Sequence, residues 1–210
     1  MRVEAQAKES IESTLSILLE EVDEYERKRF MVAPIGSSMR HILCGPQHAE
    51  AIRAIQNEAI LNSTALYDYK PRTPEMMADW FAAKAKGNFP VIGVENDDFE
   101  LMGFASYGTF RAWPAYKYSV EHSVYVDARF RGRGFGRQLM ERLIEAAQSQ
   151  DYHVMIGGID AANQASIALH NRMGFTQCAS IKQAGFKFGR WLDLEFYQLV
   201  LPTPKSPVDG

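Results

Sequence analysis

The fold is decided by residues 118–150, which read YSVEHSVYVDARFRGRGFGRQLMERLIEAAQSQ. The stretch begins with a run of β-branched and aromatic residues at 119–126, which predicts a largely buried strand. After a short polar turn, the glycine-rich segment 131–136 opens a helix. The apolar residues of this helix recur with helical spacing, so that one stripe faces a sheet. The stripe consists of Leu139, Met140, Leu143, Ile144 and Ala147.

A glycine-rich turn at a helix N-terminus is suited to bind a phosphate group. Unpaired backbone N–H groups gather there at the positive end of the helix dipole, and glycines let a ligand reach the backbone. A dinucleotide fingerprint would require glycine at 137, where Arg137 stands, and the Gly-Lys-Ser/Thr of a P-loop is absent. The remaining pattern, Arg131-x-x-Gly134-x-Gly136, predicts a phosphate or pyrophosphate ligand. The structural alternative is tight packing of the helix against the strand.

The composition is typical of one soluble globular domain. Of 210 residues, 46% are apolar and 23% are charged, which suits one well-buried core. The net charge of −3 argues against nucleic acid as the main partner. No apolar run approaches the roughly 18 residues of a membrane span, and the N-terminus lacks the apolar core of a signal peptide. Cys44 and Cys178 are therefore expected to be free thiols in a reducing cytoplasm.

The order of the predicted elements is that of a mixed α/β domain over residues 39–201. Strands are predicted at 39–43, 89–95, 101–107, 119–126, 154–158, 176–186 and 191–201. Helices are predicted to begin at Pro46, Pro74, Gly136 and Gln164, the second and fourth with Thr73 and Asn163 as N-caps. Residues 1–38 are expected to form a separate amphipathic helical extension, whose apolar stripe would pack on the domain, a second subunit or another protein. Residues 202–210 contain three prolines and are expected to be a disordered tail.

Three further segments are similar to one enzyme family when they are read together with the glycine-rich turn. They are Y-x-x-SVEHSVYV at 116–126, SIALHNRMGF at 166–175 and AGFKFGRWLD at 184–193. These motifs resemble the GNAT superfamily of N-acetyltransferases, and more specifically its phosphinothricin and methionine sulfoximine N-acetyltransferase branch. The resemblance covers residues 39–201 and implies an α/β (α+β) fold with a mixed, mostly antiparallel central sheet flanked by helices. It also implies acetyl-CoA as co-substrate, a small-molecule amine as acceptor, and no metal.

Glu121 is the candidate general base, because it is a carboxylate in the middle of an otherwise apolar strand. Acetyl transfer requires an unprotonated nitrogen, so an amino-acid ammonium must first lose a proton. The structural alternative for Glu121 is a salt bridge or an edge position. The resemblance implies the catalytic role, since the family's glutamate at this position lies beside the acceptor amine.

His170 is the candidate general acid for the thiolate that leaves. It lies on the helix predicted from Gln164, at a position where many GNAT enzymes carry a tyrosine. Histidine, with an ordinary pKa of about 6.5, donates or accepts a proton at physiological pH. A purely structural hydrogen bond is the alternative, with a water protonating the thiolate instead.

The resemblance implies that acetyl-CoA is bound by a turn, a strand and a helix start. The turn 131–136 holds the pyrophosphate, and the backbone of the central strand pairs with the pantetheine arm. The N–H of Val124 or Tyr125 polarises the thioester carbonyl, and Asn163 contacts the arm. The candidate cofactor-binding residues are Val124, Tyr125, Val126, Arg131, Gly132, Arg133, Gly134, Phe135, Gly136, Asn163 and Ser166.

The acceptor pocket is expected to be lined by Tyr67, Phe110, Arg111, Trp113, Tyr116 and the turn 187–191, which begins with Lys187. Arg111 is suited to receive an acidic group of the acceptor, in a bidentate manner if that group is a carboxylate. A solvated surface arginine is the alternative. Trp113 stands where the phosphinothricin enzymes are expected to carry a basic residue, which argues against phosphinothricin itself as a good substrate.

The leading hypothesis is an acetyl-CoA-dependent N-acetyltransferase that acts on a small amino acid or amino-acid analogue by direct transfer in a ternary complex. Acetylation of a peptide, a protein or a polyamine is an alternative, although a polyamine calls for an acidic pocket. A non-catalytic acyl-CoA-binding module is less favoured, because it needs neither Glu121 nor His170. A homodimer is expected from the family analogy and from the apolar stripe of residues 1–38, with no nucleic-acid and no membrane partner.

Overall fold

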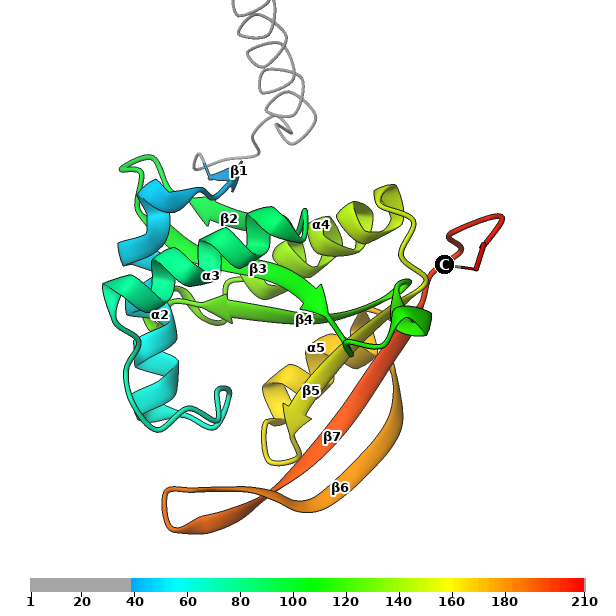
Figure 1. Ribbon diagram of the computed structural model, residues 1–210. Coiled ribbons are helices and arrows are strands. Elements are labelled where there is room, and N and C mark those ends of the chain that lie inside the picture. Colours follow the sequence, from blue (N-terminus) through cyan, green and yellow to red (C-terminus); the bar gives the residue numbers. More distant parts are fainter. Residues whose placement is uncertain (1–38, 210) are drawn as a thin grey trace, which may run out of the picture.

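A seven-stranded sheet forms the centre of residues 39–209, the part of the chain that the computed structural model describes (Figure 1). Its strands are β1 (Arg40–Leu43), β2 (Val91–Glu95), β3 (Leu101–Thr109), β4 (Ser119–Val126), β5 (Val154–Asp160), β6 (Thr176–Lys187) and β7 (Arg190–Val200). They lie in the order β1-β2-β3-β4-β5-β7-β6, and every neighbouring pair is antiparallel except β4 and β5. This confirms the mixed, mostly antiparallel sheet. The predicted helical extension at 1–38 lies outside the described residues.

Within the described part of the chain, four α-helices pack on the two faces of this sheet. They are α2 (Ala49–Asn62), α3 (Pro74–Lys86), α4 (Phe135–Ser149) and α5 (Gln164–Arg172). Side chains alternate along β3, so Phe104 packs with α2 and α3 while its neighbour Ala105 packs with α4. The apolar stripe predicted for α4 is the part of that helix that enters the core, where Leu139, Met140 and Leu143 are fully buried.

The helix boundaries follow local sequence signals. The Thr73 hydroxyl accepts a hydrogen bond from the N–H of Met76, and the Asn163 side chain accepts one from the N–H of Ser166. Both predicted N-caps are thus confirmed. Pro46 opens a short 3₁₀ turn, Pro46–His48, and α2 itself begins three residues later than predicted.

The parallel strands β4 and β5 are paired only at one end. Their register joins Ser119, Val120 and Glu121 to the segment 154–156. Beyond Glu121, β4 remains paired with β3 and β5 remains paired with β7, but the two strands are not paired with each other. The sheet therefore opens between the second halves of β4 and β5, and this opening positions the site.

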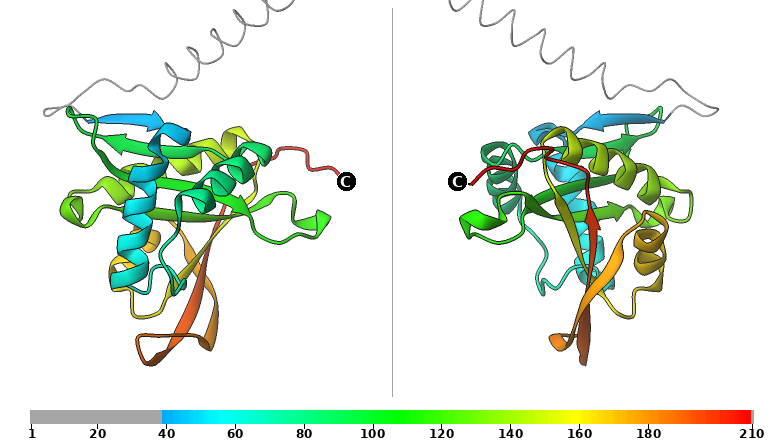
Figure 2. Two further views of the ribbon diagram at one scale, coloured as in Figure 1. Left: turned by 60° about the vertical axis from the view of Figure 1, so that its left-hand side comes forward. Right: turned by 90° about the vertical axis from the view of Figure 1, so that its right-hand side faces the viewer.

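The last two strands extend beyond the ends of their neighbours, at the bottom of Figures 1 and 2. After β7, the Thr203 hydroxyl donates to the carbonyl of Tyr152, and the backbone N–H of Val208 donates to the Tyr118 hydroxyl. This placement of residues 202–209 differs from the expected disordered tail. Proline content predicted the lack of regular structure but not these contacts with the core. In residues 39–209, no helix combines the length and apolar character that a membrane crossing requires.

Candidate active site

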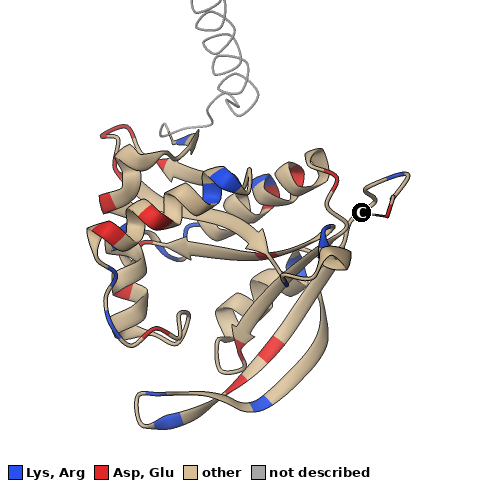
Figure 3. Ribbon diagram, in the orientation of Figure 1, with Lys and Arg blue, Asp and Glu red and all other residues tan. Residues whose placement is uncertain are grey.

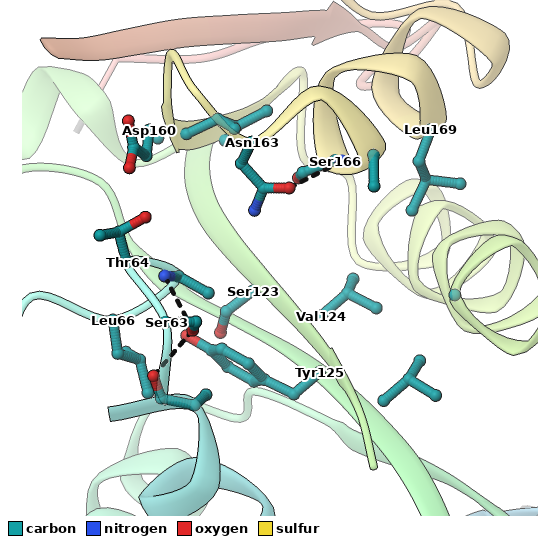
Figure 4. A pocket seen from close by; sticks show the side chains of 18 of the residues that line it. Ser63, Thr64, Leu66, Ser123, Val124, Tyr125, Asp160, Asn163, Ser166 and Leu169 are labelled. Atoms are coloured by element: carbon teal, nitrogen blue, oxygen red, sulfur yellow. Dashed lines mark hydrogen bonds between the residues drawn. The ribbon is translucent and has the colours of Figure 1, made fainter. Parts of the chain in front are cut away.

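A cavity of about 1140 Å³ occupies the opening between β4 and β5. Figure 4 shows Ser123, Val124 and Tyr125 on one side of it, and Asn163, Ser166 and Leu169 on the other. The glycine-rich turn lines one end of this cavity, and the loop that follows α2 lines the opposite end together with Glu121. The cavity thus connects the predicted phosphate site to the predicted base.

The backbone of β4 presents unpaired groups to this cavity. The N–H of Asp127 donates to the carbonyl of Met102 at 2.9 Å, and hydrogen-bonded pairs alternate along an antiparallel ladder. The peptide groups of Tyr125 and Ser123 therefore form hydrogen bonds with β3, whereas those of Val124 and Val126 face the β5 side. Because β5 has separated there, Val124 offers its N–H and C=O to a ligand. Of the two N–H donors considered for the thioester carbonyl, this geometry favours Val124.

The turn before α4 has the backbone conformation that only glycine adopts readily. Gly132 has φ +78° and Gly134 has φ +87°, in the left-handed region. Gly134 is the N-cap of α4 and supplies no side chain to the first N–H groups of the helix, which stay available to an anion. A Cβ at either glycine would meet no atom within 4 Å, so the glycines serve conformation and ligand approach rather than internal packing.

Two arginines of this turn are placed differently. The guanidinium of Arg131 pairs with Glu58 of α2 and also donates to the carbonyl of Val126 at 3.0 Å. Arg131, Gly132, Gly134, Phe135 and Gly136 all line the cavity. Arg133 is the predicted cofactor residue of this turn that does not, and its guanidinium lies 5.4 Å from the ring centroid of Phe130.

Glu121 is half-buried at the point where β4 and β5 separate. A Cβ at residue 158 would lie 3.4 Å from its Oε1, so Gly158 leaves room for the carboxylate. Burial raises the pKa of Glu121, and the charge of Arg111 opposes this shift to a lesser degree. A raised pKa makes the carboxylate a stronger base, which suits proton removal from an ammonium.

His170 is paired with a second histidine, His122, whose side chain lies on the face of β4 opposite to that of Glu121. The two rings stack with centroids 5.1 Å apart, and their Nε2 atoms are 3.2 Å apart. Nδ1 of His170 lies 2.7 Å from the carbonyl oxygen of Ser166, which only accepts, so this nitrogen carries the proton. In the neutral pair, Nε2 of His170 therefore accepts from Nε2–H of His122. Burial lowers the pKa of both rings.

The predicted acceptor residues divide between two cavities. Tyr67 lines the large cavity, with its ring against Gly185. Arg111, Trp113 and Tyr116 line a smaller neighbouring cavity of about 210 Å³, which meets the first at Thr109. Phe110 lines neither cavity but packs edge-on against Tyr116, with ring centroids 5.7 Å apart.

Lys187 lines neither cavity, which differs from its expected place in the acceptor pocket. Its side chain is buried, and its Nζ donates to the carbonyls of Ile60 at 2.7 Å, Ser63 at 2.9 Å and Leu66 at 2.6 Å. All three N–H groups of the ammonium are thus used within the protein. Lys187 instead fastens the loop after α2, which is part of the cavity wall, to the tip of the β6–β7 hairpin.

Lys84 and Asp160 line the large cavity but were not among the predicted site residues, whereas Arg190, which also lines it, lies in the predicted turn 187–191. Asp160 is buried and accepts a hydrogen bond from the N–H of Ala162, and Arg190 lies 3.5 Å from its carboxylate. Lys84 follows Trp80 by one helical turn, so its position on the inner side of the predicted helix was the available signal. Within residues 39–209, no group of three or more His, Cys, Asp or Glu side chains is placed to hold a metal ion.

Comparison with known proteins assigns the family. The model of the acetyltransferase (GNAT) family matches residues 54–175, which is more than half of the chain. The chain therefore belongs to the GNAT family and is an N-acetyltransferase.

The most informative relatives are acetyltransferases of amino-acid analogues. An L-methionine sulfoximine/L-methionine sulfone acetyltransferase from Pseudomonas paraeruginosa is 44% identical over 74% of this chain and 91% of the relative. A phosphinothricin N-acetyltransferase from Streptomyces coelicolor is 33% identical over 69% of this chain and 85% of its own length. The crystal structure of a phosphinothricin acetyltransferase from Sinorhizobium meliloti in complex with AcCoA has a TM-score of 0.77 and 30% identity, covering 82% of this chain and 93% of the other.

Proposed function

We propose that the protein transfers an acetyl group from acetyl-CoA to the amine of a small amino acid or amino-acid analogue of the methionine sulfoximine type. The single observation that carries this proposal is the cavity between β4 and β5, which joins a glycine-rich helix N-terminus to a half-buried carboxylate. The names of the relatives support the acceptor class, and the AcCoA complex of the Sinorhizobium enzyme supports the co-substrate. The transfer is proposed to be direct, with both substrates bound together.

The residues of the opening fit acetyl-CoA, which supplies the acetyl group as a thioester. The N–H groups at the start of α4, with Gly132 and Gly134 beneath them, suit a pyrophosphate. Arg131 adds a positive charge there once it exchanges Glu58 for the phosphate oxygens. The N–H and C=O of Val124, together with the N–H of Val126, suit an extended amide-containing arm, which would lie against β4 like a further strand.

Glu121 is proposed to take the proton from the acceptor ammonium, directly or through one water. Its raised pKa, caused by burial, brings the basicity of the carboxylate closer to that of the amine. Arg111 is proposed to orient the acceptor from the neighbouring cavity through an acidic or polar group. Protonation of the thiolate by His170 stays a prediction, because both ring nitrogens have partners within the protein.

We further propose that the protein is a homodimer in which the closing strands or the acceptor loops meet. Large apolar side chains are exposed on β6, β7 and the turn between them, which favours a covered surface. They are Ile181, Phe186, Phe188, Trp191 and Val200. Light scattering at tens of micromolar tests this proposal, and a mass near the 23.7 kDa of one chain would contradict it.

The function is tested by acetyl transfer to methionine sulfoximine, phosphinothricin, common amino acids and polyamines, with thiol release as the readout. We expect turnover with the amino-acid analogues and little with polyamines. Glu121→Gln should lower kcat by about 10²–10⁴-fold with little change in the KM for acetyl-CoA, and higher pH should partly restore it. The matched control is Glu145→Gln, on the exposed side of α4. Turnover of polyamines alone, or wild-type kcat in Glu121→Gln, would refute the proposal.

A further inference from the structure

A second positively charged side chain, in addition to Arg111, lies near the part of the cavity where the acceptor is expected to bind. Lys84, in the last turn of α3, lines the cavity, and its Nζ donates to the carbonyl of Tyr107 at 2.6 Å. Burial is the main cause that lowers the pKa of Lys84 to about 8, and the charge of Arg72 acts in the same direction. Within residues 39–209, no carboxylate offsets these effects. An ammonium has three N–H donors, so Lys84 has capacity for a further, negatively charged partner.

The space between Lys84 and Glu121 is open because residue 108 is a glycine. Gly108 pairs with Glu121 across β3 and β4, so a side chain at 108 would project from the same face as Glu121. A Cβ there would have one neighbour within 4 Å, the Nζ of Lys84 at 3.6 Å. A cation from α3 and a carboxylate from β4 therefore flank one uncovered piece of backbone.

Lys84 also has a structural role that must be separated from any role in binding. Extending the β2–β3 register by one residue places Pro90 opposite Tyr107, and proline has no N–H for the Tyr107 carbonyl. Lys84 supplies that hydrogen bond. In addition, α3 carries acidic residues toward its N-terminal end and basic residues toward its C-terminal end (Figure 3). These charges interact favourably with the helix dipole. The hydrogen bond needs a donor but not a charge.

We infer that Lys84 binds the carboxylate of an α-amino acid acceptor over Gly108 and so places the acceptor amine beside Glu121. In an α-amino acid the two groups share one carbon, so a carboxylate held by Lys84 leaves the amine within reach of a base on the other side of the glycine. Arg111 lines the neighbouring cavity, where its guanidinium is available to bind the side chain of the acceptor. This inference rests on the proposed function and narrows the acceptor to amines with an adjacent free carboxylate.

The test compares two acceptors that differ only in the carboxylate: L-methionine sulfoximine and its carboxamide. Lys84→Gln keeps a hydrogen-bond donor and removes the charge. Since a charge-assisted bond is lost, kcat/KM for the acid should fall by roughly 10–100-fold, mainly through KM. The carboxamide should be acetylated by the variant as efficiently as by the wild type. Lys84→Arg should retain selectivity for the acid, and Lys86→Gln, on the exposed part of the same turn, is the control.

The outcomes separate this inference from the proposed function. If the wild-type protein acetylates neither acceptor, the proposed function fails and the inference fails with it. If the wild type prefers the acid but Lys84→Gln keeps that preference, the inference alone is overturned. An equal loss with both acceptors, accompanied by a lower unfolding midpoint, also overturns it, because it assigns Lys84 a structural role only.

Discussion

Replacing Lys187 by methionine should destabilise the protein, because the ammonium binds the carbonyl of Ile60 in the last turn of α2 and those of Ser63 and Leu66 in the loop that follows. Methionine keeps the unbranched apolar stem, so the change removes the hydrogen bonds with little change in packing. A hydrogen bond to a charged group contributes about 1.5–3 kcal/mol, and three set an upper limit of roughly 4.5–9 kcal/mol. Water will reach some of the freed carbonyls, and the buried ammonium no longer has to be desolvated. We therefore expect a loss of about 2–4 kcal/mol.

Urea unfolding of the Lys187→Met variant measures this loss directly. The control is Lys182→Met on the same strand, where the lysine is exposed and pairs with Asp193 at 3.0 Å. An exposed pair of this kind contributes about 0–1 kcal/mol. If Lys187→Met leaves the unfolding free energy within about 0.5 kcal/mol of the wild type and raises only the acceptor KM, the structural assignment is wrong. Lys187 would then be the substrate ligand that its sequence position suggested.

Three further outcomes are expected. Gly134→Val should weaken acetyl-CoA binding by about tenfold or more, roughly 1.4 kcal/mol by calorimetry, because a β-branched residue does not adopt φ +87° readily; unchanged affinity would contradict the pyrophosphate assignment. Gly157→Ala should cost about 1–3 kcal/mol, since its Cβ would lie 2.9 Å from Nε2 of both His122 and His170; a wild-type melting temperature would show that the pair moves freely. A thiol reagent at pH 8 should modify the exposed Cys178 and spare Cys44, whose pKa burial raises to about 12; two modified thiols in the native protein would be the opposing result.

The parts of the fold that the sequence predicted well are those encoded locally. Strand β4 and helix α4 follow from composition and helical spacing, and the caps Thr73 and Asn163 follow from side-chain chemistry at the first turn. Strand ends were less predictable. β5 runs two residues further than expected, to Asp160, because its pairing with β7 continues there.

The parts that could not be predicted depend on contacts between distant segments. Lys187 stands in a polar turn, where a lysine usually points to solvent, and its burial results from a loop more than 120 residues earlier. His122 alternates with half-buried positions of β4, and its partner becomes evident only when β5 and α5 bring His170 beside it. The helical spacing placed Lys84 on the inner side of its helix, but no sequence motif identified it as a site residue. Periodicity places a side chain on a face, and it does not identify what that face meets.

Because the β6–β7 hairpin is attached to the loop after α2, the two halves of the site should form at different stages of folding. In the predicted cofactor half, strand β4 and the glycine-rich turn both lie within residues 118–150, so contacts between them close short loops and should form early. The acceptor wall needs Lys187 and Phe186 to reach Leu66 and Tyr69, across 121 and 117 residues respectively. During synthesis, the pyrophosphate turn should therefore form before the acceptor wall is complete. Substitutions in the hairpin can then alter which amine is accepted while the cofactor half is left intact.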